Sequence, residues 1–229
     1  MPLIEMRKVS KVYRLGSQQV QAVADLQLAI DKGEFTVLAG PSGSGKTTVL
    51  NLIGGLDQPT GGSIAIGGND IADYPARALS EFRLRNIGFI FQSYNLIPVL
   101  TAAENAEFVL MLQGVGARQR RQKVLSLFHD LGLDGLENRR PCDLSGGQQQ
   151  RVAIARAMAA EPAVILADEP TANLDSKTSE DLLDLMRRLN EHQGVTFLFS
   201  SHDPMVIAHA RRVVELKDGR LHADNRKEG

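Results

Sequence analysis

The stretch Phe35-Thr36-Val37-Leu38-Ala39-Gly40-Pro41-Ser42-Gly43-Ser44-Gly45-Lys46-Thr47 joins a run of apolar and β-branched residues to a glycine-rich loop. The loop matches the phosphate-binding P-loop, and it stands after a predicted strand and before a predicted helix, as this motif requires. Glycine N–H groups can wrap a β-phosphate, the Lys46 ammonium can reach the β and γ oxygens, and the Thr47 hydroxyl can ligate Mg²⁺. The alternative is a glycine turn with a purely structural role. We predict a nucleotide phosphate site made of Gly40, Pro41, Ser42, Gly43, Ser44, Gly45, Lys46, Thr47 and Thr48.

Other apolar runs predict the sheet around this loop. The runs Ile87 to Phe91, Val164 to Ala167 and Thr196 to Phe199 are nearly continuous in apolar or β-branched residues, as buried and mostly parallel strands are. Helical patterns follow Gly45, Gly147 and Ser176, so strands and helices alternate. This alternation predicts an α/β fold with ligands at the carboxyl ends of the strands.

The N-terminal part follows a different pattern. Leu26, Leu28 and Ile30 alternate with polar or small residues, and Ile64 and Ile66 do the same. Such alternation is typical of half-exposed antiparallel strands, so we expect a small β layer beside the mostly parallel sheet.

The strand signal disappears between Phe91 and Val164. Thr101 with Glu104 forms a capping box for one predicted helix, and a second helical pattern ends at Gly132. We therefore predict a single domain over 1–229 with an inserted α-helical subdomain over 93–160. Near the C-terminus, Asp218-Gly219 predicts a hairpin turn, and we expect the tail from Asp224 to Gly229 to be frayed.

Polar residues follow three of the predicted buried strands. Asp168 and Glu169 end the run from Val164, in the order of a metal-holding acid and a water-activating acid. Gln92 follows the run from Ile87, where an amide can sense a γ-phosphate, and His202 follows the run from Thr196, where an imidazole can bond the same phosphate. We predict Glu169, His202, Gln92 and Lys46 as catalytic residues and Thr47, Gln92 and Asp168 as metal ligands. Taken singly, each has a plainer explanation as a strand-end or surface residue.

A second glycine-rich stretch, Leu144-Ser145-Gly146-Gly147-Gln148-Gln149-Gln150-Arg151, begins a helix against its own propensity. Ser145 and Gln148 form a capping box, while paired glycines in the first turn cost roughly 1 kcal/mol each relative to alanine. Their bare backbone suits a close-approaching phosphate, although glycine at a helix start also serves packing. The P-loop already supplies one set of phosphate-binding N–H groups, and this helix start supplies a second set from a separate part of the chain. The simplest explanation is a two-fold dimer in which Ser145, Gly146, Gly147 and Gln148 face the nucleotide bound to the partner's P-loop.

Two further residues are candidates for nucleotide contacts. Tyr13 near the first strands can stack on adenine, or it can be a half-buried core tyrosine. Asp175 follows the acidic pair closely enough to touch the partner subunit at the dimer seam, or it can be a solvated helix cap.

Composition excludes several classes of protein. The 229 residues carry 26 Lys and Arg against 27 Asp and Glu, so the net charge of −1 provides no general field for nucleic acid or an anionic membrane. The single cysteine, Cys142, forms no internal disulfide, and the N-terminus lacks the pattern of a signal peptide. No apolar stretch approaches the roughly 18 residues of a membrane span. We therefore expect a cytoplasmic protein that reaches a membrane only through a partner.

Together these motifs resemble the nucleotide-binding subunit of ABC transporters over nearly the whole chain. The matching segments are Walker A at 40–47, the Q-loop glutamine Gln92, the signature at 144–148, Walker B at 164–168 followed by Glu169, the D-loop at 173–175 and the switch histidine His202. The resemblance implies an ATPase that uses ATP and Mg²⁺, dimerises on ATP and drives an integral membrane permease subunit from the cytoplasmic face of the cell membrane.

The stretches Asn51 to Gly61 and Phe91 to Ala102 resemble the lipoprotein-release and macrolide-efflux subfamily. This resemblance implies export, efflux or lipoprotein release, with a docking surface around residues 94–108. A second possibility within the same subfamily is signalling to cell-wall enzymes during division. A DNA-repair ATPase of related architecture would carry a coiled-coil insertion or a basic DNA surface, and the sequence has neither.

Overall fold

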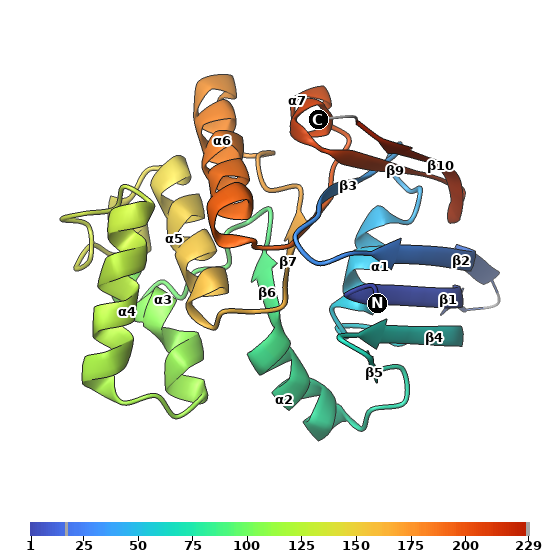
Figure 1. Cartoon of the computed structure of the whole chain (residues 1–229), viewed down its shortest axis with the longest axis horizontal. Helices are drawn as coiled ribbons and strands as arrows, with labels where there is room; N and C mark the ends of the chain where they lie inside the picture. Colours follow the sequence, from blue (N-terminus) through green and yellow to red (C-terminus); the bar gives the residue numbers. More distant parts are fainter. Residues whose placement is uncertain (17, 228–229) are drawn as a thin grey trace.

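The computed structural model describes residues 1–16 and 18–227, which form two sheets and a set of helices (Figure 1). The smaller sheet is antiparallel in the order β2-β1-β4-β5, as the alternating pattern predicts. Its strands are β1 (Ile4–Leu15), β2 (Gln18–Ile30), β4 (Gly61–Ile66) and β5 (Asn69–Asp70).

The larger sheet has the order β10-β9-β3-β8-β7-β6. Its strands are β3 (Phe35–Ala39), β6 (Ile87–Ile90), β7 (Val164–Asp168), β8 (Phe197–Ser200), β9 (Arg212–Lys217) and β10 (Arg220–Arg226). All neighbours pair in parallel except β9 and β10, so the predicted mostly parallel core is confirmed. The predicted strand at 196–199 lies one residue later than expected.

The helices are α1 (Lys46–Ile53), α2 (Ala76–Asn86), α3 (Ala102–Leu112), α4 (Ala117–Asp130), η1 (Pro141–Asp143), α5 (Gly146–Ala159), α6 (Ser176–Gln193) and α7 (Pro204–His209). Between β6 and β7 the described elements are all helical, and α3, α4 and α5 gather on the side away from the antiparallel strands (Figure 1). Both predicted capping boxes, Thr101 with Glu104 and Ser145 with Gln148, are present. The division into one domain with a subdomain over 93–160 stays a prediction.

Each face of the parallel sheet buries its own core. Val37 points into the core shared with α3, α5 and α6, whereas its neighbour Leu38 points into the core shared with α1 and the antiparallel sheet. Because β3 is covered on both faces, all of its residues are buried. This explains why its sequence is a continuous run instead of an alternating one.

The C-terminal hairpin is confirmed, but the frayed tail is not. Asp218 and Gly219 have positive φ at the turn, and β10 continues through Asp224 and Asn225 to Arg226. The prediction of fraying from Asp224 is therefore wrong as far as Lys227, while residues 228–229 lie outside the described residues. Contacts between residues far apart in the chain hold the tail in place, and no local sequence pattern predicts them.

The main contact is the guanidinium of Arg212, whose side chain is 8% exposed. It donates two hydrogen bonds to Asp224, at 2.8 and 2.7 Å, and further bonds to Glu34 and to the Ala29 carbonyl. Lys227 adds hydrogen bonds from its ammonium to the carbonyls of α7. One buried cation thus ties β10 to the loop before β3.

None of the helices in the described part of the chain has the length and apolar character needed to cross a bilayer.

We expect Asp224→Asn to lower the free energy of unfolding by about 1 kcal/mol at pH 7, because Asp224 is partly exposed and solvent screens the pair. Hydrogen bonds from Arg212 hold the pKa of Asp224 below its ordinary value. A depressed pKa stabilises the fold above the unfolded-state pKa of about 3.9, and this contribution disappears as the pH falls through the folded-state pKa. Urea unfolding should therefore show a difference from wild type at pH 7 that shrinks below about pH 4.

The matched control is Glu81→Gln, which breaks the exposed Arg85–Glu81 pair and should change little at either pH. Equal destabilisation of Asp224→Asn at pH 7 and pH 3 would contradict an electrostatic role for this carboxylate.

Candidate functional site

A cavity of about 380 Å³ opens at the carboxyl ends of the parallel strands. The loop after β3 and the first turn of α1 contribute Ser42, Gly43 and residues 45–48 to its lining. Gln92 follows β6, Glu169 follows β7 and His202 follows β8, and these three also line the cavity. The strand pairing explains this arrangement, because neighbouring parallel strands end at the same edge of a sheet. The fold brings together all four predicted catalytic side chains, Glu169, His202, Gln92 and Lys46.

The P-loop requires glycine at different positions for different structural reasons. A Cβ at Gly40 would lie 2.3 Å from the Leu216 carbonyl oxygen, and one at Gly45 would lie 2.5 Å from the Ala22 carbonyl oxygen. Both glycines also have positive φ, so the loop fits between β9 and β2 only without side chains there. Gly43 has positive φ and open space where a Cβ would be, which leaves its backbone accessible from the cavity.

Two polar groups of the loop are buried at its centre. The Lys46 ammonium donates hydrogen bonds to the carbonyls of Gly40 and Pro41, at 2.8 and 3.0 Å, and the residue is 7% exposed. The Ser44 hydroxyl is buried and has no hydrogen-bond partner among the described residues. A buried cation beside an unsatisfied hydroxyl fits a loop that binds a polyanion.

The two acids after β7 have different environments. Asp168 accepts a hydrogen bond from the Thr47 hydroxyl at 3.1 Å, so two of the predicted metal ligands are in contact. Glu169 accepts a bond from the Ser201 hydroxyl at 2.8 Å, and its other carboxylate oxygen lies 2.6 Å from Nδ1 of His202. Glu169 has φ of 44°, an uncommon conformation for a residue with a side chain.

Sequence reasoning missed Ser201. This residue is fully buried, its hydroxyl fixes the Glu169 carboxylate, and its backbone N–H donates to the Leu38 carbonyl. Its position directly before His202 was the available signal. A serine next to a candidate site residue forms no pattern of its own, so only the fold identifies its role.

The loops around Gln92 and Asp175 are connected through Asn173. The Asn173 side chain donates to the Gln92 carbonyl at 2.9 Å, which links the loop after β6 to the loop before α6. Asp175 caps α6, accepting bonds from the Thr178 N–H and hydroxyl. The cap is therefore real, and a contact between Asp175 and a partner subunit stays a prediction.

Residues 145–148 do not line the P-loop cavity. Gly146 and Gly147 both have packing reasons within the chain. A Cβ at Gly146 would lie 2.9 Å from the Tyr94 hydroxyl, and one at Gly147 would lie 2.5 Å from Cγ2 of Thr178. These contacts support the packing explanation for both glycines, and their role toward phosphate stays a prediction.

Tyr13 is partly exposed on the antiparallel layer instead of lying inside the core, and it does not line the cavity. It is 36% exposed and pairs across the β1–β2 ladder with Val20, which lines the cavity. Burial raises the pKa of Tyr13, and the hydrogen bond from its hydroxyl to Asp57 raises it further.

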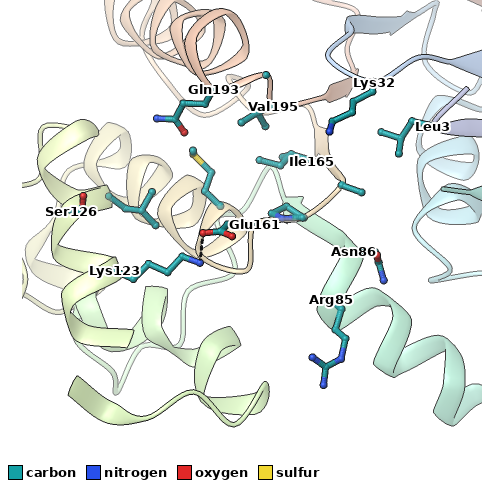
Figure 2. A pocket seen from close by; sticks show the side chains of 15 residues that line it. Leu3, Lys32, Arg85, Asn86, Lys123, Ser126, Glu161, Ile165, Gln193 and Val195 are labelled. Carbon is teal, nitrogen blue, oxygen red and sulfur yellow. Dashed lines mark ion pairs between the residues drawn. The ribbon is translucent and has the colours of Figure 1, made fainter. Parts of the chain in front are cut away.

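Another cavity, of about 620 Å³, lies near the amino ends of β7 and β8. Figure 2 shows the side chains that line it. Polar side chains at its rim include Lys32, Arg85, and the ion pair of Lys123 with Glu161. None of the described residues that line it was predicted as a site residue. The predicted chemistry is therefore concentrated at the opposite end of the sheet.

Comparison with known proteins gives a consistent result. The model of the ABC transporter family matches residues 23–172. An uncharacterized ABC transporter ATP-binding protein of Thermotoga maritima is 44% identical over 98% of this chain and 96% of that protein. The macrolide export ATP-binding/permease protein MacB of Burkholderia pseudomallei is 44% identical over 97% of this chain, which spans about a third, 34%, of that relative's length.

Solved structures agree with the fold. The ATP-binding cassette MJ0796 of Methanocaldococcus jannaschii, in a dimeric post-hydrolysis state bound to ADP and Pi, superimposes with a TM-score of 0.91. Its sequence is 42% identical, and the match covers 99% of both chains. With the P-loop, Glu169, Gln92 and His202 lining one cavity and Asp168 in contact with Thr47, the chain belongs to the ABC transporter family and is one of its ATP-binding, ATP-hydrolysing chains.

Proposed function

We propose that two copies of this chain enclose two ATP molecules, with the P-loop of one protomer facing residues 145–148 of the other. One observation carries this proposal. The cavity that holds Lys46, Glu169 and His202 receives no lining from residues 145–148, although these residues form a helix N-terminus suited to phosphate. A two-fold arrangement supplies the missing side of each site. The similarity to MJ0796, which is dimeric in its solved structure, supports this geometry.

The side chains fit a magnesium ion held jointly with phosphate. Among the described residues no group of three or more His, Cys, Asp or Glu could hold a metal ion. Mg²⁺ is typically bound by one or two protein oxygens together with substrate phosphates and waters. Thr47 and Asp168, already in contact, would hold it, with Gln92 at the same cavity. The ion would neutralise charge that develops on the phosphate oxygens.

Glu169 is the residue to which we assign the activation of water. Ser201 and His202 each contact one oxygen of its carboxylate, so the side chain is oriented from both ends. A carboxylate fixed in this way can accept a proton from water that attacks the γ-phosphate. Lys46 and the loop amides position the phosphates, and His202, which is exposed toward the cavity, can bond the γ-phosphate.

An apolar groove of about 630 Å³ offers a docking site for the membrane partner. It is formed by α2, the loop after β6 and α3, and includes Leu56 and Leu112, which are 47% and 56% exposed. Arg156 lines the groove and donates to the carbonyls of Tyr94 and Asn95, in the loop that begins with Gln92. A segment of an integral membrane permease seated here would contact the same loop that reaches the nucleotide.

We infer that the assembly drives export at the cytoplasmic face of the cell membrane, as efflux or lipoprotein release. Similarity to MacB, whose chain combines ATP-binding and permease parts, supports an export role. The permease would carry the cargo site, because the ATPase motifs do not discriminate between cargoes.

Glu169→Gln should retain ATP binding while slowing hydrolysis by about 10²-fold or more, because the amide cannot accept the proton from water. We expect the variant to accumulate as a dimer in ATP, measured by size-exclusion chromatography, together with phosphate release. Glu180→Gln, on the exposed surface of α6, is the matched control. A Glu169→Gln protein that stays monomeric yet hydrolyses ATP at the wild-type rate would contradict the role of this residue.

Lys46→Ala should weaken ATP binding itself by roughly tenfold or more, since a charge-assisted hydrogen bond to phosphate contributes about 1.5–3 kcal/mol. Isothermal titration calorimetry with Mg·ATP measures the effect. Lys32→Ala, at the distant cavity of Figure 2, should leave the affinity unchanged. Equal ATP affinity of Lys46→Ala and wild type would refute phosphate binding by Lys46.

A further inference from the structure

A charged pair on the antiparallel layer holds the ring of Tyr13. The Tyr13 hydroxyl donates to Oδ2 of Asp57 at 2.7 Å, and the Lys11 ammonium donates to Oδ1 of the same carboxylate at 2.5 Å. The Lys11 ammonium also lies 4.9 Å from the centroid of the Tyr13 ring. One carboxylate thus fixes the hydroxyl end of the ring, and one cation covers a ring face.

The pair is itself well anchored. Lys11 donates a second hydrogen bond, to the Gln58 carbonyl, and Asp57 accepts one from the Gln58 N–H at 2.7 Å. The Lys11 side chain is only 12% exposed, and that of Asp57 is 27% exposed. Although partial burial opposes it, hydrogen bonding from Lys11 and Tyr13 keeps the pKa of Asp57 below its ordinary value. The carboxylate therefore stays ionised and in place at neutral pH.

This cluster lies beside the P-loop cavity. Val20, opposite Tyr13 in the β1–β2 ladder, lines that cavity. A fixed aromatic ring next to a phosphate loop is a platform for a nucleotide base, because base–aromatic stacking favours binding. A ring free to rotate would lose conformational entropy on binding, and a ring already fixed would not.

We infer that Asp57 and Lys11 are positioning residues for the nucleotide base, which hold Tyr13 with one face covered by Lys11 and the other available for stacking. The inference rests on the proposed ATP site and assigns a role to two residues outside it. Neither residue lines the P-loop cavity. Their effect is therefore confined to the part of the affinity that depends on the base.

The test compares two ligands, Mg·ATP and inorganic tripolyphosphate with Mg²⁺, by isothermal titration calorimetry. Asp57→Ala should weaken ATP binding about five- to tenfold, within the range that loss of one base–aromatic stack produces, and leave tripolyphosphate binding unchanged. Asp57→Asn should weaken ATP binding less than Asp57→Ala does, because the amide oxygen can still accept a hydrogen bond from the Tyr13 hydroxyl. Glu5→Gln, which breaks the exposed Arg7–Glu5 pair on the same strand layer, should affect neither ligand.

A double-mutant cycle isolates the contact with the ring. In a Tyr13→Phe background Asp57→Ala should change ATP affinity by less than twofold, because the hydroxyl that Asp57 holds is gone. Additive losses, equal losses for ATP and tripolyphosphate, or no loss for ATP would each overturn the inference. If wild-type protein bound neither ligand, the proposed phosphate site itself would fail, which is a different outcome from failure of the positioning role.

Discussion

The parallel hydrogen-bonded ladder of β3, β8, β7 and β6 is the constraint on which the site depends. In this ladder Val37 lies opposite Phe199, Phe199 opposite Ala167, and Ala167 opposite Ile90, so the four strands end within two residues of one another. The P-loop, His202, Glu169 and Gln92 each follow one of these strands. A shift of register in any one strand would move its side chain out of the cavity, because each residue along a strand advances it by about 3.3 Å.

The strands of this ladder could be predicted because they are buried on both faces. A continuous apolar run is a strong signal, and the polar residue that ends it marks the edge of the sheet. The end of β10 lacked such a signal, since its residues from Asp224 onward are exposed and alternate only weakly. Its order comes from Arg212, twelve residues away, and from Glu34 at the other end of the chain. An ion pair at this separation in sequence cannot be recognised from either segment alone.

Gly146 and Gly147 illustrate a different limit of prediction from sequence. Sequence suggested either packing or phosphate approach, and both explanations use the same property of glycine, its lack of a Cβ. The structure supplies the packing partners, Tyr94 and Thr178, which lie 52 and 31 residues away in the chain. Tyr94 lies in the loop after β6 and Thr178 in the first turn of α6, and both contact the start of α5 only in the folded chain. The two explanations are compatible, because a helix start packed tightly on one side can still present its amides on the other.

Glu169 has a left-handed backbone conformation, which glycine adopts more readily than other residues. A non-glycine residue in this region costs of order 1–3 kcal/mol, and here the hydrogen bond from its N–H to the Ser200 carbonyl helps to maintain it. Replacement by glycine would remove that strain along with the carboxylate. At this position a substitution that raises thermal stability would therefore lower turnover. Screening variants for heat resistance alone would favour proteins that no longer hydrolyse ATP.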